Sequence, residues 1–520
     1  MRSLYTVIFI TIFVLPITSI KAQPSYYKAW EVAVPYYNQL LVDTNGFSYV
    51  GGISGSVFKI MKYDPSGNFV WQSNPISASS VKMKFDKNKD IIVAGVATVT
   101  PTDKDFLVAK VTSAGLVSWT TTVDNQNSID SMIDFSVDYN NCVLAIGNTY
   151  VNADTNASFF TVKIDVTGGL LWKRTYTFNI AKVNSPISVI VDSANNAYVY
   201  GAIFSFTPYI DNDSIAFVKY RSDGSLIRAV RYFASCFNHI DNAYDRFFDG
   251  MKSFLFRNKV YFIHEMSCFE EDHRSVIEVV DTSFSNWSNF LDIPAVNIRG
   301  VRVYEYKGQL TITGDSTYSS RITGNTYSDP FFMVYGQNGF KSLYSIPLIN
   351  KYGITFRANL LNNGNYSLSY SGGEAGSYFK FTITAVDSAV KNIFWYDVND
   401  GFIRAQETDG YNSIFVLKDS MGSASLEKYK SSALGIENYC CNSDRLRISP
   451  NPSVDNIIIE TLSSENQLLQ IFDLTGRLVL RQNTTGKMTT INLSGLGAGI
   501  YNVCATTKEG ELHTRLAIMK

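Results

Sequence analysis

A pattern of short strands and turns that recurs along most of the chain constrains its fold more than any other feature. One half of each copy has an apolar strand, a polar turn with Asp, and a second apolar strand that ends near Gly. Such internal repetition is the signature of a fold built from stacked, similar units. The clear copies of this half are 41–52, 84–95, 136–147 and 191–201, and weaker ones lie at 304–314, 361–370 and 408–418.

The other half of each copy is a strand, a turn with Gly, and a strand that often carries Trp. The turn residues Asp, Ser, Asn and Gly break the apolar runs at fixed offsets, which is typical of tight hairpins. The clear copies of this half are 58–71, 106–119, 159–172 and 216–230, and drifted ones lie at 276–287, 332–344 and 379–395.

Four short strands per copy, with a period of about 45–60 residues, favour a β-propeller over a sandwich. We therefore expect an all-β propeller of seven to eight four-stranded blades across residues 24–430. The drift of the later copies leaves both counts open. The Trp-bearing segment 27–32 has no preceding partner, and the last copy, around 426–429, lacks a following Trp strand. Pairing the two segments in one blade would close the ring and remove an exposed sheet edge.

Composition narrows the possible partners. The formal net charge is −1 and charged residues make up 18% of the chain, so neither nucleic acid nor an anionic membrane is expected as a partner. Aromatic residues reach 14%, which suits half-buried strands.

Residues 445–520 form a second, smaller module, which we expect to be a β-sandwich joined by a linker at 431–444. Two prolines mark the entry to its first strands, because proline cannot donate a ladder hydrogen bond. A turn and a Gly-x-Tyr strand follow, and the chain ends on a basic residue. The residues that make up this motif are Pro450, Asn451, Pro452, Asp473, Gly476, Arg477, Gly499, Tyr501 and Lys520.

In type and order these residues resemble the type A C-terminal sorting domain of the Bacteroidetes type IX secretion system. The resemblance implies that the module is a ligand for the export machinery. The N-terminus agrees, since residues 1–22 combine Arg2 with a short apolar run and a small residue at Ala22, as in a signal peptide. No later segment is long and apolar enough to span a bilayer. We therefore expect a secreted or cell-surface protein with no transmembrane segment in its mature form.

Motifs for metal binding and catalysis are weak. Asp86 to Asp90 places oxygen ligands at alternate positions, but no Gly or Glu follows where a calcium loop needs them, so we read it as a hairpin turn. The segment 236–273 holds His264 and His273 without zinc-site spacing. A disulfide between Cys236 and Cys268 is the better expectation for an exported protein. We expect no metal and no cofactor.

No nucleophile elbow or phosphate-binding loop is found, so no catalytic residue is assigned. The sequence therefore favours a non-enzymatic module that binds an extracellular glycan or protein over an enzyme. The alternative is an extracellular polysaccharide-active enzyme with its site at the propeller mouth, whose residues would be recognised only from geometry.

Overall fold

The structure is a computed structural model in which all regular elements of the described residues are strands. The chain divides into two compact units, Met1–Ser432 and Ala433–Lys520. The description covers residues 25–519 except 36–38, 56, 101–102, 127, 151–156, 180–182, 205–213, 234–252, 257–258, 269–271, 285–286, 294–296, 307–308, 320–325, 337–338, 346–352, 373–379, 387–392, 421–422, 433–445, 452, 462–466, 474–477 and 508–509.

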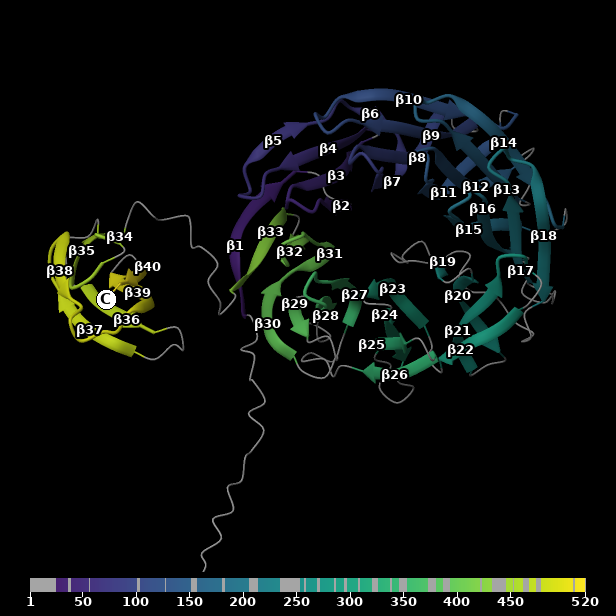
Figure 1. The fold of residues 1–520 in the computed structure, drawn as a ribbon. Helices are drawn as coiled ribbons and strands as arrows, with labels where there is room; N and C mark the ends of the chain where they lie inside the picture. The colour runs from purple at the N-terminus through teal and green to yellow at the C-terminus, as the bar shows by residue number, and fades with distance from the viewer. Residues whose placement is uncertain are drawn as a thin grey trace, which may run out of the picture. The chain divides into compact units, whose positions relative to one another are not determined.

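The first unit is a set of antiparallel sheets arranged around a ring, a propeller-like architecture (Figure 1). The expectation of an all-β fold is therefore confirmed. The first sheet holds β2 (Gln39–Val42), β3 (Ser48–Ser54), β4 (Val57–Tyr63) and β5 (Phe69–Gln72), with β6 (Ile76–Ser77) beside β4.

The next sheet has eight strands in two halves of four. The halves are β7 (Ser79–Phe85), β8 (Ile91–Thr100), β9 (Asp103–Val111) and β10 (Val117–Val123), then β11 (Ile129–Val137), β12 (Val143–Tyr150), β13 (Ala157–Ile164) and β14 (Leu170–Tyr176). One parallel pair, Ile129 with Lys104, joins them.

Four further sheets follow in chain order, each with four strands. They are β15 (Val183–Val191), β16 (Ala197–Phe204), β17 (Ser214–Tyr220) and β18 (Leu226–Phe233); β19 (Ser253–Phe256), β20 (Lys259–Cys268), β21 (Asp272–Asp281) and β22 (Trp287–Ile293); β23 (Asn297–Tyr306), β24 (Gln309–Ser319), β25 (Thr326–Gly336) and β26 (Gly339–Ser345); and β27 (Gly353–Leu360), β28 (Tyr366–Gly372), β29 (Lys380–Val386) and β30 (Ile393–Asp400).

The remaining sheet of this unit combines the two ends of the repeat region. Its last three strands are β31 (Phe402–Thr408), β32 (Ile414–Ser420) and β33 (Ser423–Ser432), and β1 (Ser25–Val34) pairs antiparallel with β33. Val32 lies opposite Leu426 in this register, and Lys28 lies opposite Tyr429. Strands about 400 positions apart thus share one hydrogen-bonded ladder.

The Asp turns have one recurring geometry. In the turn between β2 and β3, Asp43 Oδ1 accepts hydrogen bonds from the amides of Asn45 and Phe47 at 2.9 and 3.0 Å. A carboxylate that accepts two amides satisfies donors that the turn leaves without a ladder partner. The same pattern, with amides two and four positions later, holds at Asp64, Asp86, Asp138, Asp165, Asp192 and Asp409.

Tryptophans on the outermost strands connect successive sheets. Trp71 on β5 donates from Nε1 to the carbonyl of Ser113 at 3.1 Å, in the turn of the following sheet. A Cβ built on Gly115 of that turn would lie 2.7 Å from Trp71 Cδ2, so the ring lies directly on the glycine. The same contact joins Trp30 to Gly67, Trp119 to Gly168 and Trp172 to Gly224.

The core lies between neighbouring sheets, because each sheet is covered on both faces. One cluster combines Ile92 and Phe106 of one sheet half with Phe135 and Phe160 of the next. This explains why β8 and β12 are almost continuous apolar runs rather than alternating ones.

The second unit has two sheets that share one hydrophobic core. One sheet holds β34 (Leu446–Ser449), β35 (Asn456–Thr461) and β38 (Met488–Asn492), and the other holds β36 (Gln467–Phe472), β37 (Leu478–Thr484), β39 (Gly499–Thr507) and β40 (Gly510–Ile518). Ile457 and Ile491 from the first sheet pack with Ile471, Val503 and Leu516 from the second.

Replacing Gly115 with Ala tests the tryptophan contact. Gly115 has φ +86°, and a methyl group there would meet Trp71. Strain at positive φ plus overpacking predicts a loss of about 2–4 kcal/mol in the free energy of unfolding, measured by denaturant titration. The matched control is Gly55→Ala, where φ is +64° and no atom lies within 4 Å, so only the backbone strain remains. Equal losses in the two variants would contradict a specific role for Trp71.

Candidate functional site

The first strands of successive sheets surround the centre of the ring (Figure 1). Contacts join β31 to β2, β2 to β7, β11 to β15, β15 to β19, β23 to β27 and β27 to β31. Side chains on these inner strands are therefore brought together from distant parts of the sequence. A cluster at this place is the natural candidate for a site in a ring-shaped fold.

A polar cluster runs across four of the inner strands. Lys84 Nζ of β7 lies 3.3 Å from Asp134 Oδ1 of β11, and Lys82 Nζ lies 3.9 Å from the same oxygen. Asp134 Oδ2 accepts from the amide of Val189 and the hydroxyl of Ser188, both on β15, at 3.2 and 3.4 Å. Ser188 Oγ in turn lies 2.7 Å from Ser253 Oγ on β19.

The electrostatics of this cluster keep its carboxylate ionised. Burial alone would raise the pKa of Asp134, but Lys84, Lys82 and the amide of Val189 together lower it below its usual range. The two lysine side chains are 50% and 44% exposed, so solvent reaches them even though both ammonium groups face Asp134. The cluster can therefore bind an anionic group, such as a carboxylate or a sulfate.

Arginines also lie on inner strands in the C-terminal half of the ring unit. Arg302, Arg357 and Arg404 lie on β23, β27 and β31. Arg404 is half exposed and pairs with Asp419 at 2.7 Å. Of the acidic residues there, Glu407 accepts from Asn359 at 3.2 Å and Glu305 is exposed.

Buried Asp130 belongs to a second polar network at the start of β11. It is fully buried and accepts from the amide of Asn125 at 2.9 Å and the hydroxyl of Ser128 at 2.7 Å. Burial outweighs these hydrogen bonds and raises its pKa to about 6. At the matching position of the next sheet, on β15, Asn184 Oδ1 accepts from the amides of Phe178 and Asn179. An uncharged Asn side chain thus accepts backbone amides at the equivalent position. We infer that Asp130 holds the loop before β11 in shape.

Two lysines with little solvent exposure hold the Asp turns. Lys163 Nζ lies 2.8 Å from Asp138 and also donates to the carbonyl of Ser222 in the following sheet. Lys110 lies 2.8 Å from Asp86 and 3.0 Å from Asp90, so an ammonium group occupies the place where the sequence could have suggested calcium.

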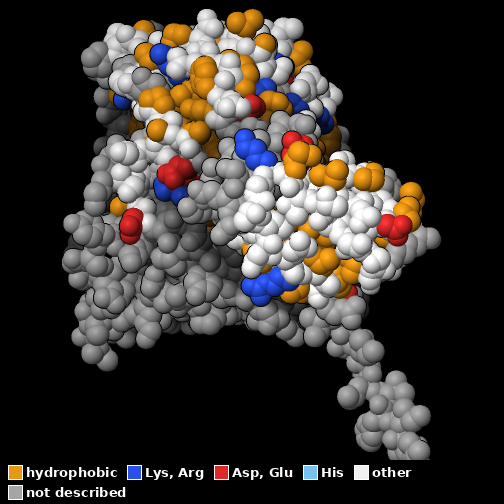
Figure 2. Space-filling model, turned by 90° about the vertical axis from the view of Figure 1, so that its left-hand side faces the viewer, with side chains coloured by type: hydrophobic (Ala, Val, Ile, Leu, Met, Phe, Trp, Pro, Cys, Tyr) orange, Lys and Arg blue, Asp and Glu red, His pale blue; other side chains and the backbone are white. Residues whose placement is uncertain are grey.

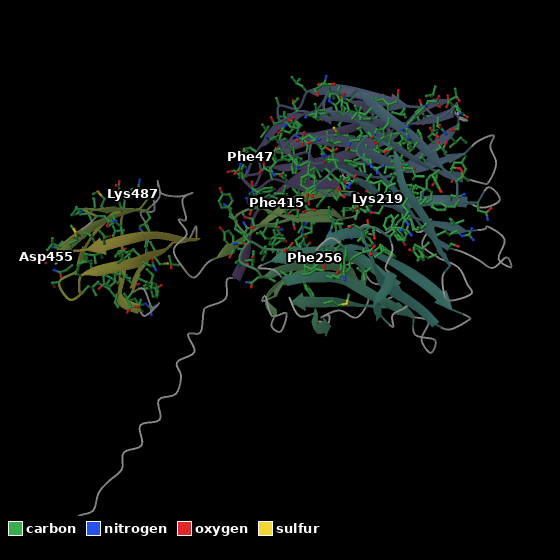
Figure 3. The ribbon with its side chains drawn as sticks, turned by 45° about the vertical axis from the view of Figure 1, so that its right-hand side comes forward. Phe47, Lys219, Phe256, Phe415, Asp455 and Lys487 are labelled. Atoms are coloured by element: carbon green, nitrogen blue, oxygen red, sulfur yellow. The ribbon has the colours of Figure 1, made fainter. Side chains whose placement is uncertain are left out.

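Three further lysines pack over aromatic rings of their own sheets. Lys219 Nζ lies 4.7 Å from the ring centre of Tyr198, and Lys62 and Lys428 lie 4.5 and 4.7 Å from those of Phe47 and Phe415. Figure 3 labels Lys219, Phe47 and Phe415 in the ring unit. Lys428 is buried and the other two are partly buried, and burial lowers the pKa of all three lysines.

The surface shows no concentration of one charge on the face drawn in Figure 2, where described acidic and basic side chains are scattered among hydrophobic and uncharged ones. This distribution matches a net charge of −1.

The motif residues of the second unit lie at strand ends and in its core. Pro450 directly follows β34, Asp473 follows β36, and Gly499 begins β39. Asn451 Oδ1 accepts from the amide of Ala517 at 2.9 Å, and Tyr501 donates to the carbonyl of Gly497 at 2.9 Å. Pro452, Gly476, Arg477 and Lys520 lie outside the described residues.

The predicted disulfide also lies outside the described part of the chain. Cys236 falls in the undescribed range 234–252, and the side chain of Cys268 at the end of β20 is not described. The sequence did not single out the inner-strand lysines. Their signal was the Lys-x-Lys spacing of residues 82 and 84 just before a recognised repeat turn.

Comparison with known families decides the role of the second unit. Residues 447–519 match the family described as the Secretion system C-terminal sorting domain. This unit is a type IX secretion sorting domain. The protein is therefore exported and either secreted or attached to the cell surface, in contact with the secretion machinery. No helix among the described residues is long and apolar enough to cross a membrane.

A curated relative corrects the prediction about catalysis. The chain is 24% identical over 244 residues to the ulvan lyase NLR42 of Nonlabens ulvanivorans, across 46% of this chain and 42% of the relative. The chain thus matches less than half of that relative's length. The sequence-based preference for a non-enzymatic protein is contradicted by this match to a polysaccharide lyase. That preference rested on the absence of contiguous catalytic motifs. A site assembled from separate strands would not produce such a motif.

Two solved structures are distantly similar to this chain. The WD40 domain of SCAP from fission yeast has a TM-score of 0.40 and 8% identity, over 76% of this chain and 97% of that one. A PL25 ulvan lyase has a TM-score of 0.37 and 9% identity, over 78% of this chain and 94% of that one.

The raised pKa of Asp130 predicts how stability depends on pH. A carboxyl whose folded pKa lies above its unfolded pKa stabilises the fold when protonated, and this contribution is lost as pH rises from about 4 through about 6. We expect Asp130→Asn to remove a decline of about 1–3 kcal/mol across that window. Thermal unfolding at a series of pH values measures it. The control Asp223→Asn, at an exposed turn, should keep the decline, and an unchanged profile for Asp130→Asn would show the prediction to be wrong.

Proposed function

We propose that this protein is an extracellular polysaccharide-active enzyme of the lyase class, acting on an acidic polysaccharide after export through the type IX system. The observation that carries the proposal is the match over 244 residues to a curated ulvan lyase. The sorting domain supports it, because a polymer too large to enter the cell must be cut outside.

The inner-strand cations suit the chemistry of such a reaction. A lyase removes the proton next to a uronate carboxyl group and then eliminates the glycosidic oxygen, so negative charge builds up on the carboxylate. Fixed positive groups that stabilise this charge lower the barrier. Lys82 and Lys84 are exposed, close together and backed by ordered polar partners, and Arg404 is exposed on another inner strand. They are our candidates for binding substrate anions.

The architecture that we propose for the passenger is an eight-bladed ring over residues 24–430. Each half of the eight-stranded sheet counts as one blade, and the blade of β31, β32 and β33 takes β1 as its fourth strand. A linker at 431–444 then leads to the sorting domain at 445–520. In that domain we propose that Pro450, Asn451, Asp473, Gly499 and Tyr501 maintain the surface that the export machinery recognises.

The proposed activity predicts a chromophore. Elimination at a uronate creates a double bond conjugated with the carboxylate, so digestion of ulvan should increase ultraviolet absorbance and shorten the polymer. Neutral glucans, which carry no acidic proton of this kind, should stay unchanged. New reducing ends without the chromophore would identify a hydrolase instead. If no acidic polysaccharide among ulvan, alginate, pectate and chondroitin sulfate is cut, the proposal fails.

Lys82→Ala tests the inner-strand cations. Lys84 remains next to Asp134 in this variant, so the buried carboxylate keeps a partner and the fold should be retained. Loss of one charge-assisted contact to the substrate predicts a decrease of about tenfold in kcat/KM. The control is Lys59→Ala, a partly exposed lysine on β4, away from the inner strands. Equal activity of both variants would exclude Lys82 from substrate binding.

A further inference from the structure

Three aspartates meet at one end of the sheet half formed by β7 to β10. Asp103 and Asp105 begin β9, and Asp124 follows β10 directly. Since Val123 pairs with Phe106 in this antiparallel ladder, Asp124 stands opposite Asp105. Asp103 and Asp105 are two positions apart and so share one face of the strand. The sheet geometry thus directs all three carboxylates to one place.

The carboxylates are close, and one of them is deeply buried. Each of the three offers an oxygen within 4.8 Å of the others. Asp105 is only 7% exposed, and its Oδ1 has no hydrogen-bond partner. Asp103 Oδ1 is likewise buried without one. A buried carboxylate oxygen without a partner is costly, and like charges placed opposite each other in a sheet add to that cost.

Cations of the described residues do not neutralise Asp103 or Asp105. Among the described residues, no lysine or arginine forms an ion pair with Asp103 or Asp105, and Lys173 donates to the backbone carbonyl of Asp124 at 2.7 Å. By contrast, Asp86 and Asp90 in the same sheet half both form an ion pair with Lys110. Burial and the charges of Asp124 and Asp103 also raise the pKa of Asp105.

We propose that Asp103, Asp105 and Asp124 bind a divalent cation of the hard, oxygen-seeking class, with Ca²⁺ as its natural member. The donors are all carboxylate oxygens, without the nitrogen or sulfur that zinc or copper prefers. Calcium takes six to eight oxygens in flexible geometry, so water and nearby carbonyls complete its coordination. Extracellular calcium modules bind in the range of about 10⁻⁴–10⁻³ M, which suits an exported protein.

The position of the site suggests what the cation does. Next to these aspartates, Lys104 pairs with Ile129 at the parallel junction between the two sheet halves, and its amide donates to the carbonyl of Ser128 at 3.4 Å. An ion held by β9 and by the segment after β10 would fix the end of one sheet half against the start of the next. This function is independent of the proposed lyase activity, and it concerns stability.

Calcium titration of the full-length protein tests the proposal. After treatment with a chelator and dialysis, addition of CaCl₂ should give saturable heat in isothermal titration calorimetry and raise Tm by about 2–4 °C. Asp105→Asn should abolish both effects. Without calcium the same variant should melt at or above the wild-type Tm, because one of three repelling charges is gone, so failure to fold is distinguishable from failure to bind.

The control is Asp223→Asn, at an exposed turn in another sheet, which should keep the calcium response of the wild type. The proposal is overturned if calcium leaves the wild-type Tm and heat signal unchanged. It is also overturned if Asp105→Asn retains the full response, since calcium would then bind elsewhere. Because the readouts are heat and Tm, an inactive enzyme would not affect the result.

Discussion

The contact between a tryptophan on an outermost strand and a glycine turn of the following sheet is the constraint on which the ring depends. It fixes two sheets at once, since the indole ring lies on the turn and its Nε1 donates to a carbonyl of that turn, as in the contact of Trp71 with Gly115 and Ser113. The turn has room for the ring only because Gly lacks a Cβ, and the Asp turns keep the adjoining strands in register. Four such contacts connect five consecutive sheets or sheet halves.

Buried charged side chains also connect neighbouring sheets. Lys163 pairs with Asp138 of its own sheet and donates to Ser222 of the next one, so removing either charge would leave the other buried and unpaired. Pairs of this kind stabilise the packing of the sheets. The charged groups to which we assign binding are different ones, namely the exposed lysines of β7 and the three aspartates at the ends of β9 and β10.

The sequence predicted the parts of this structure that depend on local pattern. Turns such as Asp43 to Phe47, the Trp-bearing strands and the sorting domain all follow from residue types at fixed offsets. The meeting of Asp105 with Asp124 depends on strand register, and that of Lys84 with Asp134 depends on packing between sheets, so no contiguous motif records either. The wrong preference for a non-enzymatic protein has a related origin, because it relied on contiguous motifs, which groups gathered from separate strands would not form.

The central claim is that repeated sheet-to-sheet contacts form a ring that β1 completes by pairing with β33. Hydrogen–deuterium exchange of the full-length protein, followed by mass spectrometry, tests it most directly. The account predicts that peptides covering β1 exchange as slowly as those covering β32 and β33, since their amides belong to one ladder. Rapid exchange throughout β1, with β32 still protected, would contradict it.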